Sequence, residues 1–445
     1  MENFIEKNKD DLIKIVREIL KIRNVEQKAA ENAPFGEGVK AALQLALATG
    51  EKMGFKVKNL DNYAGYVEYG EGRELISVLG HLDVVPEGNG WEYHPPYGAE
   101  IYDGKLYGRG TSDDKGPIMA ALFGLYAIKE MRIPLKKRVR IIFGTNEESN
   151  WKGINYYKSI EKEPLIGFTP DGNFPVINRE KGILRITLVK KFASDNADII
   201  VRGGERANMV PDYAEAVLNQ KMIKQIQNIP EGISISENKI IARGRSAHAA
   251  KPWLGENAVA ILCETLSQVS MSEDAKSIIQ FVSDKIARTF YGEKIGVEED
   301  DKLSGKLTLN LGVLNIDKKH GEMLIDIRYP ITGKLEGIVD NIKREAEKYS
   351  ILVGKIFSLP PIFVDEKEPL VQKLISAYEE ETGEKGCAMA IGGGTYARIM
   401  EKGVAFGPVF PGVKPVEHEA NEYISIDNLV KLAKIYAKAI QRLAE

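Results

Sequence analysis

Residues 75–86 read Leu75-Ile-Ser-Val-Leu-Gly-His-Leu-Asp-Val-Val-Pro86, an apolar run that ends in His81 and Asp83. A run of this length, rich in β-branched residues and closed by Gly and Pro, predicts a buried strand that leads into a loop. Ligands of open α/β sheets lie just outside the carboxyl ends of the strands. His81 and Asp83 are therefore candidate site residues, although a single histidine at a strand end is more often structural.

The length and charge of the chain restrict its class. A chain of 445 residues is too long for one hydrophobic core and predicts two or three domains. Because 61 Lys and Arg residues nearly balance 64 Asp and Glu residues, we expect neither a nucleic-acid partner nor a membrane partner. The N-terminus lacks a signal-peptide pattern and no apolar run approaches a membrane span, so we expect a cytoplasmic protein. Cys263 and Cys387 have no partner motif, which leaves His and carboxylates as the metal ligands.

Hydrophobic periodicity predicts two kinds of domain. The first part of the chain predicts helices and strands in alternation, with helices at 12–20, 39–53 and 117–131 and strands at 55–60, 64–69, 75–79 and 138–144. This order is typical of an α/β domain with a mixed, mostly parallel sheet covered by helices. An inserted α+β domain is predicted next, with period-two strands at 183–201, 307–314 and 323–329 and helices at 257–268 and 335–349. The chain then returns to the first domain through helices at 368–381 and from Asp427, a predicted N-cap, to the end.

Acidic residues recur after strands and in glycine-rich loops. They lie in Gly110-Thr-Ser-Asp-Asp-Lys-Gly116, Asn146-Glu-Glu-Ser149, Phe168-Thr-Pro-Asp171 and Glu417-His-Glu419. Each motif alone is compatible with a solvated turn. Together with His81 they supply two histidines and three acids, the ligand count of a dinuclear site, and a carboxylate such as Asp113 can bridge ions about 3.5–4 Å apart. Imidazole and carboxylate without thiolate suit Zn²⁺, Mn²⁺ or Co²⁺.

These motifs, in this order and spacing, resemble those of the co-catalytic dinuclear zinc peptidases, which include aminoacylase, glutamate carboxypeptidase and succinyl-diaminopimelate desuccinylase. The resemblance covers essentially the whole chain and is greatest to the PepV-type dipeptidases. It implies that one metal ion is held by two residues, His81 and Asp171, and the other by His418 and Glu148. Asp113 would bridge the two ions.

The same resemblance implies the roles of three further features near the metals. Glu147 would be the general base toward a water molecule that the metal ions acidify. Asp83 would hydrogen-bond the His81 imidazole and fix its tautomer. The peptide bond between Asp113 and Asp114 would be cis, as is typical of the family.

The resemblance also makes the inserted domain a lid, and places a catalytic domain at 1–180 and 365–445 and the lid at 181–364. A lone histidine after a strand is usually structural, but in the family the residue matching His248 stabilises the oxyanion of the substrate carbonyl. Asn208 and Arg328 match lid residues that contact substrate, and Arg suits a terminal carboxylate. The insertion is long enough to contain two of the smaller lids of dimeric relatives, which predicts a monomer that supplies His248 in cis.

The glycine loop Ala390-Ile-Gly-Gly-Gly-Thr-Tyr-Ala-Arg398 lacks the Gly-Lys-Ser/Thr ending of a phosphate loop. A glycine loop that opens a helix is still an anion site through its free N–H groups. Gly393, Gly394 and Thr395 are therefore predicted to bind a substrate carboxylate.

We therefore expect a metallopeptidase, a hydrolase that cleaves unblocked dipeptides with two divalent metal ions, Zn²⁺ or, with the same ligands, Mn²⁺ or Co²⁺. The first alternative is an N-acyl-amino-acid amidohydrolase of the deacetylase or desuccinylase type, which would differ mainly in the acyl pocket. The second is a catalytically silent binder of metal or peptide. Glu147 beside the ligand set argues against that second alternative, since binding alone needs no general base.

Overall fold

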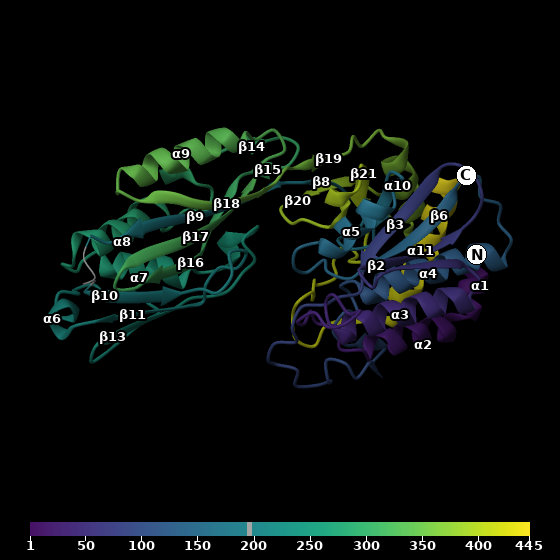
Figure 1. Cartoon of the computed structure of the whole chain (residues 1–445), viewed down its shortest axis with the longest axis horizontal. Coiled ribbons are helices and arrows are strands. Elements are labelled where there is room, and N and C mark those ends of the chain that lie inside the picture. The colour runs from purple at the N-terminus through teal and green to yellow at the C-terminus, as the bar shows by residue number, and fades with distance from the viewer. Residues whose placement is uncertain (194–197) are drawn as a thin grey trace. The chain divides into compact units, whose positions relative to one another are not determined.

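The structure is a computed structural model that describes residues 1–193 and 198–445. The described chain divides into two compact units (Figure 1). Unit 1 comprises Met1–Asn178, Val364–Met389 and Thr395–Glu445, and unit 2 comprises Arg179–Phe363 and Ala390–Gly394. The predicted borders at 180 and 365 lie close to those of the units, but the segment 390–394, expected in the first domain, groups with unit 2. Residues 194–197 of the predicted strand run 183–201 lie outside the described ranges.

Unit 1 contains a mixed sheet, as predicted. Its strands follow the order β1 (Lys56–Leu60), β2 (Ala64–Tyr69), β6 (Arg138–Gly144), β3 (Leu75–His81), β7 (Ile166–Thr169), β21 (Lys402–Ala405) and β8 (Val176–Glu180). The central strands β6, β3, β7 and β21 are parallel to one another, whereas β1, β2 and β8 pair antiparallel. Parallel pairing is thus confined to the centre of the sheet and does not dominate it. One reason is that β1 and β2 are joined by a short turn, which permits only antiparallel pairing.

The strand β3 and the helix α4 (Lys115–Glu130) form the middle of the unit 1 core. Every residue of β3 is buried, which explains why its sequence is a continuous apolar run instead of an alternating one. Gly124 lets α4 approach α11 (Ile426–Ala444) closely, because a Cβ there would lie 2.9 Å from the Ala433 carbonyl oxygen. The helix α11 begins one residue before the predicted Asp427, and its N-cap is Ser425, whose Oγ accepts the Asn428 N–H.

The other elements of unit 1 complete its layers. They are the helices α1 (Glu2–Lys7), α2 (Lys9–Leu20), α3 (Glu37–Lys52), α5 (Lys152–Ile160) and α10 (Pro369–Thr382), the 3₁₀ helix η3 (Tyr396–Ile399), and a small sheet of β4 (Glu100–Tyr102), β5 (Lys105–Tyr107) and β22 (Tyr423–Ser425). Within the part of the chain that the structure describes, none of the helices combines the length and apolar character needed to cross a membrane.

Unit 2 is an α+β fold built on a second sheet. Its strands follow the order β12 (Ile233–Ser236), β13 (Lys239–Arg243), β11 (Tyr213–Leu218), β10 (Ile199–Gly203), β16 (Thr308–Ile316), β17 (His320–Tyr329), β9 (Gly182–Lys191) and β18 (Leu352–Leu359). Neighbouring strands are antiparallel throughout. Apolar residues of α7 (Ala258–Leu266), α8 (Glu273–Lys285) and α9 (Leu335–Glu347) share one core with these strands.

Short elements complete unit 2 and the segments where the chain passes between the two units. They are α6 (Gln220–Ile223), η1 (Pro252–Leu254), η2 (Glu293–Ile295), β14 (Asp300–Asp301), β15 (Gly305–Lys306), β19 (Ile362–Phe363) and β20 (Ala388–Ile391). The last residues of β8, Arg179 and Glu180, pair with β19 inside unit 2.

Candidate metal centre

The carboxyl ends of three parallel strands of unit 1 carry predicted site residues. His81 is the last residue of β3, Glu147 and Glu148 follow β6, and Asp171 follows β7. Because β6, β3 and β7 are neighbours in the sheet, residues far apart in the chain reach one edge. This is the edge at which α/β sheets bind ligands.

Asp113 lies at the centre of the group, in the loop before α4. One of its oxygens, Oδ1, is 2.9 Å from His81 Nε2, and the other, Oδ2, is 2.9 Å from His418 Nε2. His418 Nε2 is also 3.1 Å from Glu148 Oε1, and His81 Nε2 is 3.9 Å from Asp171 Oδ2. The distances therefore place His81 near Asp171 and His418 near Glu148, with Asp113 between the two pairs.

The hydrogen bonds of His81 show that a cation fits this place. Its Nδ1 lies 2.9 Å from the backbone oxygen of Asp83. A carbonyl oxygen only accepts hydrogen bonds, so Nδ1 carries the proton, and the lone pair of Nε2 in the neutral ring points at Asp113 Oδ1. Two lone pairs at this distance repel each other unless a positive charge compensates. A divalent ion held by both groups, or a second proton on the ring, provides that charge.

The shifted pKa values of the clustered carboxyl and imidazole groups also indicate that a positive charge would stabilise the cluster. Burial, followed by the neighbouring Asp113, raises the pKa of Asp171 to about 8. Burial also raises the pKa of Glu147 well above its ordinary value, and nearby carboxylates add to the effect. Burial acts to lower the pKa of His418, but the carboxylates of Glu148 and Asp113 outweigh it and raise it to about 12. Buried carboxylates in such a cluster stay ionised only when cations compensate them, and imidazole with carboxylate suits Zn²⁺, Mn²⁺ or Co²⁺.

Asp83 makes its main contacts with the glutamate pair. Its Oδ1 accepts the Glu147 N–H and its Oδ2 accepts the Glu148 N–H, each at 3.0 Å. The carboxylate was expected on the His81 imidazole, but Oδ1 lies 3.6 Å from Nδ1, and the Asp83 backbone oxygen takes that hydrogen bond. The Asp83 carboxylate thus fixes the backbone of the loop after β6.

Asp114 is a site residue that the sequence analysis did not assign. Its Oδ2 accepts the His81 N–H at 3.0 Å, and its peptide bond with Asp113 is cis, as the resemblance implied. A Cβ at position 80 would lie 2.3 Å from that oxygen, so only glycine fits before His81. The doubled aspartate in the sequence was the available signal for this contact.

Arg109 and Glu422 are two further residues that the sequence did not indicate. They form a buried ion pair, with NH1 and Oε2 2.7 Å apart.

His248 and Asn208 lie on adjacent segments of unit 2. The Asn208 carbonyl accepts the Ala249 N–H at 2.9 Å, and residues 209 and 248 form a β-bridge. His248 is exposed, and its Nδ1 accepts the Ala250 N–H at 3.2 Å. A neutral ring with an accepting Nδ1 carries its proton on Nε2. His248 therefore presents an N–H donor, the form that an oxyanion-stabilising histidine requires.

Arg328 is buried and is held by its own unit. Its Nε is 2.5 Å from Asp326 Oδ1, and its NH1 donates to the Gly392 carbonyl at 2.8 Å. The guanidinium therefore anchors the glycine loop. Thr395 Oγ1 accepts the Ala397 N–H and caps η3, which is a 3₁₀ helix of four residues and so a shorter helix start than expected. The predicted contacts of Arg328, Gly393, Gly394 and Thr395 with substrate stay predictions.

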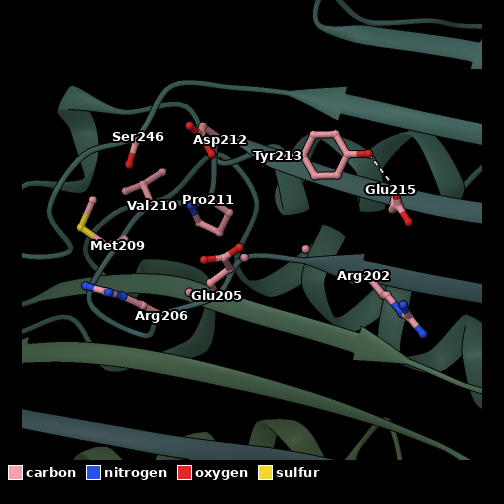
Figure 2. Close-up of a pocket in the computed structure, with 13 residues that line it drawn as sticks. Arg202, Glu205, Arg206, Met209, Val210, Pro211, Asp212, Tyr213, Glu215 and Ser246 are labelled. Atoms are coloured by element: carbon pink, nitrogen blue, oxygen red, sulfur yellow. Dashed lines mark hydrogen bonds between the residues drawn. The ribbon is translucent and has the colours of Figure 1, made fainter. Parts of the chain in front are cut away.

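A cavity of about 440 Å³ lies in unit 2 beside the turn that follows β10 (Figure 2). Charged side chains of both signs line it, among them Arg202, Glu205, Arg206 and Asp212. None of the predicted metal ligands or substrate-binding residues is among its lining residues.

Comparison with known proteins identifies the family. The model of peptidase family M20/M25/M40 matches residues 78–442. The chain is 42% identical to "Putative dipeptidase YtjP" of Bacillus subtilis (strain 168) over 459 aligned positions, which cover 99% of this chain and 98% of that protein. The protein belongs to peptidase family M20. With the ligand cluster of unit 1, it is a metallopeptidase of that family.

Solved structures share the fold. Human carnosine dipeptidase 1 superposes with a TM-score of 0.64 at 14% identity, covering 100% of this chain and 98% of that chain. The dipeptidase Dug1p of Saccharomyces cerevisiae gives a TM-score of 0.61 at 14% identity, with the same coverage. At this level of identity the likeness shows the fold alone.

Proposed function

We propose that this protein is a dipeptidase that hydrolyses the peptide bond of unblocked dipeptides with two divalent metal ions. The observation that carries the proposal is the position of Asp113, whose two oxygens each lie 2.9 Å from a different imidazole Nε2. A carboxylate placed in this way suits a bridge between two ions. The full-length similarity to a protein named as a dipeptidase supports the substrate class.

The proposal assigns five ligands to the two ions. His81 and Asp171 would hold one ion, His418 and Glu148 the other, and Asp113 both. When bound, the ions would acidify water and polarise the scissile carbonyl group. Asp83 and Asp114 would keep the ligand loops in place through the hydrogen bonds described above.

Glu147 is the proposed general base. One of its carboxylate oxygens lies within 4.8 Å of ligand atoms of both His81 and Asp171, and its backbone is fixed by Asp83. It would take a proton from the attacking water while the water oxygen bonds to the carbonyl carbon. It would then give that proton to the amine nitrogen as the C–N bond breaks. The products are two free amino acids, and Glu147 returns to its starting form.

The residues of unit 2 are proposed to act on the substrate. His248 would donate its Nε2–H to the carbonyl oxygen on which negative charge develops. Asn208 and Arg328, together with the loop residues Gly393, Gly394 and Thr395, would bind the rest of the dipeptide. Among the hydrogen bonds of the described residues, Arg328 uses three of its five N–H groups on Asp326 and Gly392, and we propose that the other two bind a carboxylate.

The metal identity, subunit state and location complete the proposal. The ligands suit Zn²⁺, and also Mn²⁺ or Co²⁺. We propose a monomer in the cytoplasm. The cysteines support that location, because Cys263 and Cys387 are free thiols, as is usual in a reducing compartment.

Hydrolysis of matched substrates tests the proposal. Metal-stripped protein is reloaded with Zn²⁺, Mn²⁺ or Co²⁺ and given free dipeptides, a tripeptide, and N-acetyl and N-succinyl amino acids, with Glu147→Ala as the inactive control. We expect metal-dependent cleavage of the free dipeptides. Cleavage of the acylated substrates alone would identify an amidohydrolase instead, and no cleavage at all would leave a silent binder.

A further inference from the structure

Glu422 occupies the hollow of the loop that carries Asp113. The side chain is fully buried, and its Oε1 accepts the Ser112 N–H at 2.9 Å and the Asp113 N–H at 3.2 Å. The Gly110 N–H lies 3.1 Å from both carboxylate oxygens. Backbone N–H groups that converge in this way form an anion site. In this chain the anion is a carboxylate of the protein itself.

Arg109 connects the same carboxylate to two other segments. Its NH1 donates to Glu422 Oε2 at 2.7 Å and to the Glu419 carbonyl at 3.2 Å. Its NH2 donates to the carbonyl of Glu87, beyond the β3 end, at 3.2 Å and to that of His418 at 3.4 Å. One buried guanidinium therefore holds the segment after His81, the Asp113 loop and the His418 loop together.

Stability alone does not account for a buried ion pair at this place. Removing two charges from water costs about as much as their attraction returns, so apolar side chains of the same size are usually at least as stabilising. An apolar pair, however, accepts no hydrogen bonds and so cannot orient a backbone peptide. The Glu422 carboxylate reaches backbone groups 309 residues away in the chain and orients the peptide of Asp113, the residue that faces both imidazoles.

We propose that Arg109 and Glu422 are positioning residues for the metal centre: their ion pair sets the His418 loop against the Asp113 loop and so fixes the distance between the two metal positions. The inference rests on the proposed function. It assigns to these residues no contact with substrate or with the reacting atoms.

Two variants test this role through the metal itself. Glu422→Gln keeps the size and one accepting oxygen but removes the charge that pairs with Arg109. Arg109→Lys keeps the charge but loses the fork that reaches the carbonyls of His418 and Glu87. The matched control is Glu68→Gln, which neutralises another ion pair of unit 1, with Arg140 NH2 and Glu68 Oε2 2.6 Å apart, on strands β2 and β6.

The readouts are the affinity of the metal-free protein for Zn²⁺, measured by competition with a chromophoric chelator, and the visible spectrum of the protein loaded with Co²⁺. We expect Glu422→Gln to weaken binding about 10- to 100-fold, the usual effect of losing a residue that orients a ligand. Its Co²⁺ spectrum should change as well. Arg109→Lys should show a smaller loss of affinity with a similar spectral change, and Glu68→Gln should match the wild type in both.

Wild-type affinity and a wild-type spectrum in both site variants would overturn the inference and leave the pair as packing only. If Glu422→Gln does not fold, the Zn²⁺ affinity and the Co²⁺ spectrum of Arg109→Lys test the inference without it. Neither readout uses a peptide. A wild type that binds two ions but cleaves no dipeptide would therefore contradict the proposed function and leave this inference standing, whereas a wild type that binds no ions would contradict both.

Discussion

The histidines of the two units are held in different ways. His81 of unit 1 is 1% exposed, and both ring nitrogens lie within hydrogen-bond distance of Asp83 and Asp113. His248 of unit 2 is exposed, and its Nδ1 accepts a backbone N–H of its own turn. Burial thus fixes His81 before any ligand arrives, whereas the second imidazole of unit 1, His418, is exposed and lies between the carboxylates of Asp113 and Glu148. Unit 2 keeps its candidate donor at the surface, where a substrate can reach it.

This difference predicts unequal effects of substitutions in the two units. Changes in unit 1 should act on metal binding or on proton transfer, and changes at the unit 2 candidates should act on turnover without affecting the metals.

The largest effect is expected for Glu147→Gln. Loss of a general base lowers kcat by about 10²–10⁴-fold, and we expect the upper end of this range because the variant cannot accept a proton. Metal content, measured by atomic emission, should remain at the wild-type level. The neighbouring substitution Glu148→Gln is the control, and it should lower the metal content itself. Equal metal loss in both variants would show that Glu147 is a ligand.

A smaller loss is expected for His248→Ala. Removing one oxyanion donor lowers kcat by about 10²–10³-fold. Because His248 belongs to unit 2, Zn²⁺ affinity should not change. His320→Ala is the matched control in the same unit, since His320 is partly exposed and pairs with Asp317 at 3.1 Å. A change of KM alone, with kcat retained, would contradict the oxyanion role.

Removal of the metals should destabilise one unit selectively. Ions present at about 100 times their Kd stabilise the folded state by about 2.7 kcal/mol, and a chelator removes this contribution. Hydrogen exchange should then accelerate in peptides that contain residues 81–83, 109–114 and 416–422, and stay slow in β17. Equal acceleration in both units would mean that the metals support the whole chain.

The smallest effect is a pH dependence that belongs to unit 2. Burial acts to raise the pKa of Asp301, but N–H groups of Thr332 and Ser304 outweigh it and lower it to about 2. A carboxyl whose pKa is lowered by folding stabilises the fold above its ordinary pKa of 3.8, and this contribution is lost as the pH falls toward about 2. Hydrogen exchange of peptides around 301–304 and 332 should therefore be faster at pH 2.5 than at pH 5, after correction for intrinsic rates.

Asp301→Asn should remove most of that pH dependence by making the peptides equally labile at both pH values. The control is Asp300→Asn, the exposed neighbour, which should retain it. An unchanged pH dependence in Asp301→Asn would assign the effect to another group.

The sequence was most informative where burial and chemistry coincide. The run 75–79 predicted a buried strand because its apolar residues are continuous, and β3, which extends two residues further to His81, is buried along its whole length. The ligand motifs were visible because acids after apolar strands are unusual. Their grouping around Asp113 was only implied by the resemblance, since spacing along the chain does not give distances between loops.

Other features left weak or no signals in the sequence. No pattern in the sequence predicted α5, which contains several β-branched and aromatic residues and forms against the sheet, and none predicted α8 or the strands β11 to β13. Asp427 was the predicted cap of the last helix, whereas Ser425 caps it through its hydroxyl. The contact between Arg109 and Glu422 joins residues 313 positions apart, and no local pattern reports such a pairing.

The position of β21 has a consequence for the order in which the protein is made. This strand follows every residue of unit 2 in the sequence, yet it lies between β7 and β8 in the sheet. A ribosome therefore releases β21, and His418 after it, only when nearly the whole chain has been synthesised. Until then β7 can pair only with β3, and Asp113 lacks its second imidazole. The proposed metal centre is therefore complete only near the end of synthesis.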